Sequence, residues 1–440
     1  MDKDDKSGRS LNIGFISTRF RGLDGVSLEA EKWASVMQEF GHRCFWFAGE
    51  LDREERASML VPEAFFAHPL VKELDAGLFS MQKRSRAATD ALYRRKEHLK
   101  NKLYEFIETF KLDLIIPENA LSIPMNVSLG MAITEVIAET GIPTIAHHHD
   151  FFWERPRFQL NACQDILDMA FPPDLPSIKH VVINSVARAE LAARRSIAAS
   201  LIYNVMDFDK KPPAPRDTNA QFRMDMGFGK DDIVILQPTR VVFRKGIEQA
   251  IYLVDLLDRP AVRLVVSHSV ADEGPAYGEW VKNWAIKQGV PLYFIHNRLA
   301  EEAQDAQSGA KLYSLHDVYP HADLVTYPSI YEGFGNAFLE AVYYRRPLMV
   351  NRYSVFIADI EPKGFDVVAI DGYVTREAVA KVNQILSDPA RRKEMTDKNW
   401  ELARRHFSYR VLRKELANLL SEMFGVSPPH GFFGRIFGRE

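Results

Sequence analysis

The chain has 440 residues, of which 46% are hydrophobic and 26% are charged, and its formal net charge is −3. Because single hydrophobic cores stop growing near about 250 residues, this length and composition predict a globular protein with two domains. The near-neutral charge excludes the strongly basic footprint of a nucleic-acid-binding domain, and two cysteines are too few for a disulfide framework or a cysteine metal cluster.

The first ten residues are hydrophilic and lack the apolar segment of a secretory signal, and no apolar run approaches the ~20 residues that span a bilayer. We therefore expect a cytoplasmic protein. Residues 11–17 form an apolar run, followed by a loop with Gly22 and Gly25, a helical pattern and a second apolar run at 44–48. Strand, helix and strand in this order predict a parallel βαβ unit.

The rest of the first half continues the alternation of helices and strands. An amphipathic helix is expected at 81–110, and another helix at 125–139. Short buried strands are expected at 112–116, 144–146 and 181–185.

A run of polar residues, His147, His148, His149 and Asp150, follows the strand expected at 144–146. A metal site made of three histidines is excluded, because adjacent side chains on extended backbone point to alternate faces and cannot easily share one ion. Two interpretations are left. A strand end places one histidine at a ligand site, or the run is a surface histidine cluster.

Residues 151–158 mix aromatic rings with two arginines. Aromatic faces such as that of Trp153 suit sugars, and arginine binds a carboxylate or phosphate in a bidentate manner. On extended backbone, Arg155 and Arg157 would share a face and meet one anionic group. The alternative is a packed loop with solvated arginines.

Three prolines, Pro212, Pro213 and Pro215, interrupt all periodicity at 204–219 and predict the domain boundary. Helical stretches follow, alternating with short strands expected at 233–237, 263–267, 292–295, 324–327, 348–351 and 367–370. The predicted fold class is α/β with two Rossmann-like domains. The expected boundaries are a flexible N-terminus at 1–10, a first domain at 11–205, a linker at 206–219, a second domain at 220–400, a C-terminal helix at 401–425 that returns to the first domain, and a tail at 426–440.

Two loops of the second half follow predicted strands and open helices. The loop after 233–237 carries Arg240 and Lys245, a planar fork and a point charge that can converge on a diphosphate. The stretch 328–341 contains two features of a phosphate site, namely glycines that let backbone N–H groups approach a ligand and a helix N-terminus. Its carboxylates, Glu332 and Glu340, can face a sugar and the hydroxyl pair of a ribose. The alternatives are a solvated basic loop and an ordinary helix start.

These two stretches together resemble the donor site of glycosyltransferase family 4. The resemblance is carried by R-x4-K-G at 240–246, P-S-x-x-E-G-F-G at 328–335 and E-x7-E at 332–340. Residues 24–28 and 39–42 are similar to the family's first glycine loop and the end of its first helix. The resemblance spans 11–425 and implies the GT-B fold, in which two Rossmann-like domains face a central cleft.

The resemblance implies a role for each matching position. Arg240 and Lys245 would hold the diphosphate of a nucleotide-sugar donor, and Glu340 would bind its ribose. Glu332 would hold the transferred sugar, and His149 matches the strand-end histidine that contacts this sugar in the family. The other donor-binding positions would be Gly25, which lines the cleft from the first domain, and Gly333, Phe334, Gly335 and Asn336.

The family transfers sugars with retention, which implies attack by the acceptor hydroxyl on the face that the diphosphate leaves. The donor would be of the UDP-glucose or GDP-mannose type, and the acceptor a small sugar or sugar acid bound by Trp153, Arg155 and Arg157. Residues 151–158 also resemble enzymes that build compatible solutes such as mannosylglucosylglycerate. Since cations neutralise the diphosphate, we expect neither a metal nor a cofactor, and interpret the D-x-D at Asp207 and Asp209 as structural.

Some positions depart from the family pattern. Residues 267–269 replace a glycine-rich turn, Arg345 stands where a glycine is usual, and Tyr343 and Tyr344 are bulky. These departures affect the expected detail of the donor pocket but not the diphosphate clamp.

Three other functions are consistent with the sequence. A sugar phosphorylase of the same fold would use inorganic phosphate. A peripheral lipid glycosyltransferase would contact membrane through the basic helix at 83–102 or the tail at 432–437, although membrane contact is not favoured. A non-catalytic sugar-nucleotide-binding protein would bind the donor without turnover.

Overall fold

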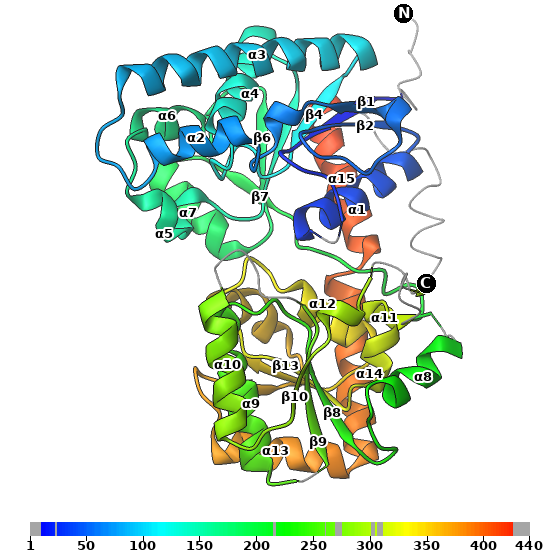
Figure 1. The fold of residues 1–440 in the computed structure, drawn as a ribbon. Coiled ribbons are helices and arrows are strands. Elements are labelled where there is room, and N and C mark those ends of the chain that lie inside the picture. Colours follow the sequence, from blue (N-terminus) through cyan, green and yellow to red (C-terminus); the bar gives the residue numbers. More distant parts are fainter. Residues whose placement is uncertain are drawn as a thin grey trace, which may run out of the picture. The chain divides into compact units, whose positions relative to one another are not determined.

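The computed structural model describes residues 10–22, 24–213, 217–259, 261–268, 275–300, 304–305 and 311–425. The segment 432–437, considered above as a membrane contact, lies outside these residues. The chain divides into two compact units: the first runs to Asn204 and resumes at Arg410, and the second is Val205–Tyr409 (Figure 1). None of the helices in the described ranges has the length and apolar character that a membrane span needs.

The first unit is built on a seven-stranded sheet in which all neighbouring strands are parallel. Every residue of the interior strand β1 is buried, as expected of a parallel sheet covered on both faces. The strand order is β3-β2-β1-β4-β5-β6-β7. The strands are β1 (Asn12–Ile16), β2 (Arg43–Ala48), β3 (Ser58–Leu60), β4 (Leu114–Pro117), β5 (Thr144–His148), β6 (Ile178–Val182) and β7 (Ala199–Leu201).

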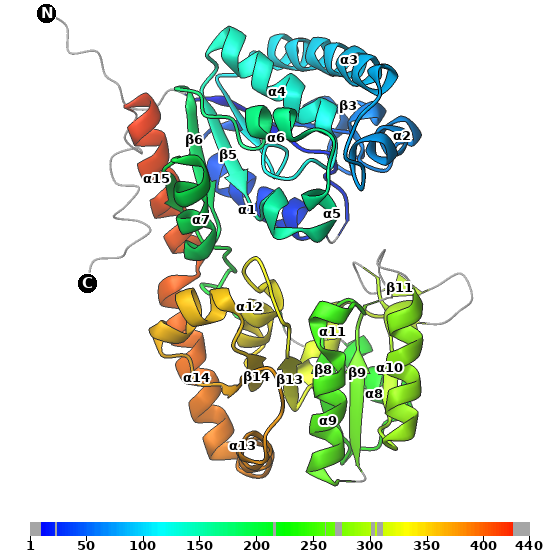
Figure 2. The same cartoon turned by 90° about the vertical axis from the view of Figure 1, so that its left-hand side faces the viewer.

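Helices of the first unit bury the apolar faces of this sheet. Helices α3 (Arg86–Phe110) and α4 (Val127–Thr140) pack against each other, and their apolar side chains share a core with β1 and β4 (Figure 2). Helix α15 (Tyr409–Phe424) is joined to α1 (Gly25–Glu39) by an ion pair of Arg413 with Glu39, Nε to Oε2 2.6 Å. The remaining helices are α2 (Pro69–Leu78), α5 (Pro156–Gln159), α6 (Gln164–Ala170) and α7 (Ser185–Arg195).

Two predicted boundaries in this unit are wrong, and helix caps explain both. The helix expected from residue 81 begins at Arg86, because the Ser85 hydroxyl accepts the N–H of Ala88 at 3.1 Å. The strand expected at 181–185 is β6, which ends at Val182. Asn184 then accepts the N–H of Ala187 at 2.6 Å and caps α7.

The second unit repeats the plan on a six-stranded parallel sheet of order β10-β9-β8-β13-β14-β15. Its strands lie within one residue of those expected from the apolar runs. They are β8 (Ile233–Gln237), β9 (Val262–Val266), β10 (Leu292–Phe294), β13 (Leu324–Tyr327), β14 (Leu348–Asn351) and β15 (Val368–Ile370). A separate antiparallel pair, β11 (Gln304–Asp305) and β12 (Lys311–Leu312), has no counterpart in the prediction.

Helices α9 (Ile247–Leu257) and α10 (Pro275–Lys287) run side by side in both views (Figures 1 and 2). Their apolar side chains join β8 and β9 in one buried cluster. The other helices of this unit are α8 (Asp217–Asp225), α11 (Leu315–Val318), α12 (Asn336–Tyr343), α13 (Arg376–Ser387) and α14 (Pro389–His406).

Both parallel sheets have a point where the direction of winding reverses. In the first unit this point lies between β1 and β4, and in the second between β8 and β13. Open parallel sheets bind ligands outside the carboxyl ends of the two strands at such a point. The strand order therefore indicates where to look for a site in each unit.

Candidate active site

The two loops that the sequence assigns to the donor lie at the switch point of the second unit. Strand β8 ends at Gln237 and leads into the loop of Arg240 and Lys245, whereas β13 ends at Tyr327 and leads into 328–335. Because β8 and β13 are parallel neighbours, both loops leave the same edge of the sheet. The position is the one at which such a sheet binds a ligand.

A hydrogen bond ties these two loops together, since Ile330 donates its N–H to the carbonyl of Arg244 at 2.7 Å. The first loop is also held to the end of its own strand, where Gln237 donates from Nε2 to the carbonyl of Lys245 at 2.9 Å. Gly246 has a φ of 60°, and a Cβ there would lie 2.5 Å from the carbonyl oxygen of Pro328. Only glycine permits this close approach of the two loops, which explains the glycine at the end of R-x4-K-G.

The carboxylate of Glu332 lies among the cations of the first loop. Lys245 forms an ion pair with it, and Arg244 binds it with 3.1 Å between Nη1 and Oε2. Burial alone would raise the pKa of Glu332, but Lys245 and Arg244 outweigh burial and hold this pKa at about 2. Burial lowers the pKa of Lys245, against the effect of Glu332. The carboxylate is therefore ionised at neutral pH.

Two residues of this group were absent from the predicted site, namely the cation Arg244 and the neighbouring His268. His268 follows β9, and its Nδ1 lies 2.6 Å from the hydroxyl oxygen of Ser267. Burial, together with the charges of Arg240 and Lys245, lowers the pKa of His268 to about 4, so its ring is neutral at neutral pH. The sequence could have indicated His268 by its position directly after a predicted strand, and Arg244 by its position next to Lys245.

The buried side chain of Tyr353 holds the glycine-rich loop in place. Tyr353 donates its hydroxyl to the carbonyl of Phe334 at 2.7 Å, and a Cβ on Gly335, whose φ is 120°, would lie 2.5 Å from this hydroxyl oxygen. The Phe334 side chain is 2% exposed and packs on Phe407. Phe334 therefore offers a ligand only its backbone. Asn336 begins α12, where the helix N-terminus favours an anion.

Glu340 lies in α12 and is fixed by the core of the unit. Tyr319 donates its hydroxyl to Oε2 of Glu340 at 2.7 Å, and the ring of Tyr319 stacks on Tyr344 with 4.7 Å between centroids. A carboxylate held in this way is oriented before any ligand arrives.

We expect Glu340→Gln to weaken binding of a nucleoside diphosphate by about tenfold to a hundredfold, because a hydrogen bond to a charged group contributes about 1.5–3 kcal/mol. Isothermal titration calorimetry measures the affinity, and thermal unfolding should show an intact fold. The matched change Glu377→Gln, on an exposed residue of α13, should leave the affinity unchanged. Equal affinity in Glu340→Gln and the wild type would remove Glu340 from the site.

Two of the positions that depart from the family pattern, Arg345 and Tyr343, pack on Trp400 within the second unit. Arg345 adopts a left-handed conformation with φ of 52°, and its guanidinium carbon lies 4.5 Å from the ring centroid of Trp400. Tyr343 also stacks on Trp400, with 5.7 Å between centroids. Arg345 thus takes the backbone conformation for which a glycine would be favoured.

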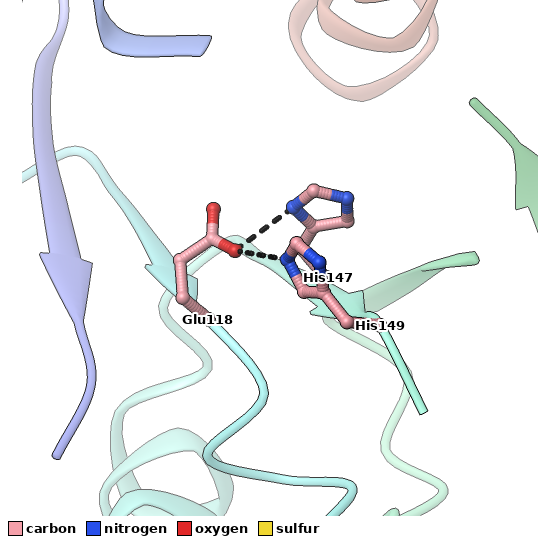
Figure 3. A group of neighbouring side chains, drawn as sticks. All are labelled: Glu118, His147 and His149. Carbon is pink, nitrogen blue, oxygen red and sulfur yellow. Dashed lines mark hydrogen bonds and ion pairs between the residues drawn. The ribbon is translucent and has the colours of Figure 1, made fainter. Parts of the chain in front are cut away.

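In the first unit, Glu118 lies beside the histidine run (Figure 3). It directly follows β4, and the histidines end the neighbouring strand β5. The carboxylate oxygen Oε2 lies 2.9 Å from Nδ1 of His147 and 3.1 Å from Nε2 of His149. All three side chains are buried, so the interpretation as a surface histidine cluster is wrong.

His148 points away from Glu118, as the alternation of side chains along a strand predicts. Its Nε2 lies 2.9 Å from Nδ1 of His180, also buried. The donor atoms of Glu118, His147 and His149 lie within 4.8 Å of one another, which is close enough for a divalent ion. Both ring nitrogens, however, already hydrogen-bond to the same carboxylate oxygen.

The D-x-D aspartates lie near basic residues of their own unit. Asp207 pairs with Lys210 at 2.8 Å between Oδ2 and Nζ, and Asp209 lies 3.6 Å from Nε of Arg404. These contacts agree with a structural role for the D-x-D.

The predicted shared face of Arg155 and Arg157 is wrong. Arg157 lies in the short helix α5 rather than on extended backbone, so residues two apart point in different directions. Arg155 donates from Nε to Oδ2 of Asp150 at 2.5 Å. The guanidinium carbon of Arg157 lies 4.4 Å from the ring centroid of Phe158.

Trp153 is held on several sides. Its ring stacks on Phe151 with 4.5 Å between centroids, and its indole N–H donates to Glu190 at 2.8 Å. The guanidinium carbon of Arg194 lies 5.5 Å from the same ring. Much of the aromatic surface that the sequence offers to a sugar is therefore used within the protein.

Gly25 begins α1, the first helix after β1. Asp24 caps this helix by accepting the N–H of Ser27 at 3.2 Å, and Gly25 itself is exposed. It thus follows one strand of the switch point in the first unit, as Glu118 follows the other.

Comparison with known proteins defines the class. The family model "Glycosyl transferases group 1" matches residues 219–401, which include both loops of the second unit. The crystal structure of Anabaena HepE in complex with UDP and glucose has a TM-score of 0.61 at 14% identity, over 94% of this chain and 100% of that chain. The fold is thus that of the two-domain GT-B glycosyltransferases.

Two curated relatives match nearly their whole length. Mannosylglucosylglycerate synthase of Thermotoga maritima is 32% identical over 92% of this chain and 99% of its own. The protein of the same name from Petrotoga mobilis is 29% identical over 92% of this chain and 100% of its own. The chain belongs to the glycosyl transferases group 1 family.

Proposed function

We propose that the chain is a retaining hexosyltransferase that moves a sugar from a nucleoside-diphosphate donor to a hydroxyl of a small sugar acid. The observation that carries this proposal is the convergence of the cation loop and the Glu332 loop at one edge of the second sheet. Arg240 and Lys245 hold the donor diphosphate, and Glu340 binds the ribose. Glu332 holds the transferred sugar, and His149 contacts it.

Catalysis in this proposal is positioning and electrostatics. The acceptor oxygen bonds to the anomeric carbon on the face that the diphosphate leaves, and the hydroxyl proton passes to a phosphate oxygen of the leaving group. Arg240, Lys245 and the N-terminus of α12 stabilise the negative charge that develops on the diphosphate. We therefore propose that donor binding needs neither a metal ion nor an organic cofactor.

The names of the two curated relatives support a specific pair of substrates. A mannosylglucosylglycerate product is made by joining a mannosyl unit to glucosylglycerate, which favours a GDP-mannose-type donor over a UDP-glucose-type donor. The acceptor then carries a carboxylate, the group that Arg157 and Arg155 suit. We propose that the enzyme works in the cytoplasm, that the unit of Val205–Tyr409 binds the donor, and that the other unit binds the acceptor.

The test compares GDP-mannose and UDP-glucose as donors with glucosylglycerate as the acceptor, and identifies the product and its anomeric configuration by mass spectrometry and NMR. Replacing the acceptor by its neutral amide should lower kcat/KM by about tenfold to a hundredfold, as expected for loss of a charged hydrogen bond. Arg157→Ala should lower it further than Arg155→Ala, since Arg155 already shares its charge with Asp150.

Both arginine variants should leave donor affinity unchanged. Equal kcat/KM for the acid and the amide would end the anionic-acceptor proposal, and a change of anomeric configuration would end retention. Turnover that depends on inorganic phosphate, or donor binding without turnover across the acceptors, would point instead to a phosphorylase or a non-catalytic protein.

A further inference from the structure

Glu118 is a buried carboxylate that the mechanism above does not use. Its residue is 0% exposed, and one oxygen serves two imidazole rings, at 2.9 Å and 3.1 Å (Figure 3). A carboxylate that is buried in this way is strongly destabilised unless it is paired and hydrogen-bonded. Its place between two histidines of one strand therefore needs an explanation.

The backbone around Glu118 and His149 is rigidly connected. Asn119 accepts the N–H of His149 at 3.0 Å through Oδ1, and donates from Nδ2 to the carboxylate of Asp150 at 2.9 Å. The N–H of Asn119 itself binds the carbonyl of His147 at 2.9 Å. Glu118 and Asn119 thus hold both the ring and the main chain of His149, and neither can shift without the other.

The two rings on Glu118 differ in their surroundings. His147 is 1% exposed and stacks on Trp33 with 4.1 Å between centroids, whereas His149, also buried, keeps 9% of its surface exposed. Nε2 is the atom of His149 that binds Glu118, and within the described part of the chain Nδ1 makes no hydrogen bond. His149 can therefore present Nδ1 to a ligand.

The charges near the two rings separate their protonation. Burial lowers the pKa of His147 in spite of Glu118, so this ring is neutral and donates its Nδ1 proton. Burial alone would also lower the pKa of His149. The hydrogen bond and charge of Glu118, with smaller effects of Glu29 and Asp150, outweigh burial and raise it.

We infer that Glu118 is a positioning residue that orients the imidazole of His149 through Nε2 and stabilises its protonated form, in which Nδ1–H donates to an oxygen of the substrate. The identity of the substrate, the donor sugar, rests on the proposed function. The orientation and protonation of His149 do not depend on it. The role of Glu118 is the one that carboxylates often have behind functional histidines: it fixes the tautomer and the ring orientation.

The first measurement needs no substrate. NMR titration of the His149 ring, assigned with His149→Gln, should give a pKa at least about 1 unit lower in Glu118→Gln than in the wild type, because the amide keeps the shape but removes the charge. Glu29→Gln should give a smaller shift, since Glu29 acts on His149 only through space. His180→Gln is the matched control, because it alters a buried histidine pair on the other face and should leave His149 unchanged.

The second measurement is the pH profile of kcat/KM. The pKa of His149 is raised, so its proton is present at low pH and lost as the pH rises. The alkaline limb in Glu118→Gln should therefore move to lower pH by the same amount, which means about tenfold less activity than the wild type at high pH and near-equal activity at low pH. If Glu118→Gln fails to fold, Glu118→Asp, which withdraws the carboxylate by one methylene, should give an intermediate shift.

An unchanged His149 titration in Glu118→Gln and Glu118→Asp overturns the inference. So does a pH profile that is scaled down without a shift, because a merely structural role would produce it. A further contrary result is the loss of wild-type activity with a chelator and its restoration by Zn²⁺ or Mn²⁺, with no such restoration in His147→Gln. That result would make the group a metal site and would also overturn the inference. If the titration shifts but His149→Gln is fully active, Glu118 still positions His149, and it is the proposed role of His149 that fails.

Discussion

Replacing Lys245 by alanine should lower kcat/KM by about a hundredfold and weaken donor binding by about tenfold to a hundredfold. A charge-assisted hydrogen bond contributes about 1.5–3 kcal/mol, and a factor of ten in affinity is about 1.4 kcal/mol. The variant also leaves the carboxylate of Glu332 with Arg244 as its remaining partner in this ion-pair group. Calorimetry with the nucleoside diphosphate and steady-state kinetics measure the two effects.

The same variant should change the acid stability of the protein. The pKa of Glu332 lies at about 2, below its ordinary value, so its ion pairs stabilise the fold above that ordinary value and are lost as the pH falls toward 2. Without Lys245 this pKa rises toward its ordinary value, so Glu332 contributes less stability above that value and the loss of stability on acidification should be smaller than in the wild type. Lys282→Ala is the matched control, because its ion pair with Glu279 is exposed on α10. Equal donor affinity in Lys245→Ala and the wild type would remove Lys245 from the clamp.

Gly335→Ala should disrupt the donor loop. The backbone there has a φ of 120°, which a residue with a Cβ adopts only with strain of about 1–3 kcal/mol. The new Cβ would also lie 2.5 Å from the hydroxyl oxygen of Tyr353, which is held by the carbonyl of Phe334. We expect a fall in melting temperature of about 5–10 °C, since 1 kcal/mol corresponds to about 2–4 °C in a domain of this size, together with loss of most transferase activity.

Two variants separate strain from collision. Gly364 has a φ of 85°, and no other atom lies within 4 Å of the position that a Cβ would take there, so Gly364→Ala carries the backbone strain alone and should keep full activity. Adding Tyr353→Phe to Gly335→Ala removes the atom that collides and should restore part of the stability. If Gly335→Ala is as stable and active as Gly364→Ala, the close packing of the loop does not matter for function.

The two loops assigned to the donor could be predicted from the sequence because each is local. Arg240 and Lys245 share one loop, and Glu332 and Glu340 share another stretch, so their spacing along the chain already constrains their spacing in space. The apolar runs likewise predicted the strands of the second sheet, since a strand buried on both faces must be apolar throughout. The errors fall at helix caps such as Ser85 and Asn184, where a single polar side chain decides the boundary.

The pair of arginines shows where local patterns fail. Their predicted common face depended on extended backbone, and the proline before Arg157 instead starts a helical turn. In a helical turn, residues two positions apart point in different directions, whereas on a strand they share a face. Arg155 also has a partner, Asp150, that its spacing along the chain did not indicate.

By itself, the sequence determined the α/β class, the division into two domains, the strands of the second parallel sheet and the residues of the cation and glycine loops, because each depends on neighbours along the chain. Only the tertiary structure decided that Glu118 joins His147 and His149, because these residues lie 29 and 31 positions apart. The parallel pairing of β4 with β5 brings the two strand ends together. Burial lowers the pKa of both rings, and the charges that raise the pKa of His149 come from residues that meet only in the folded chain.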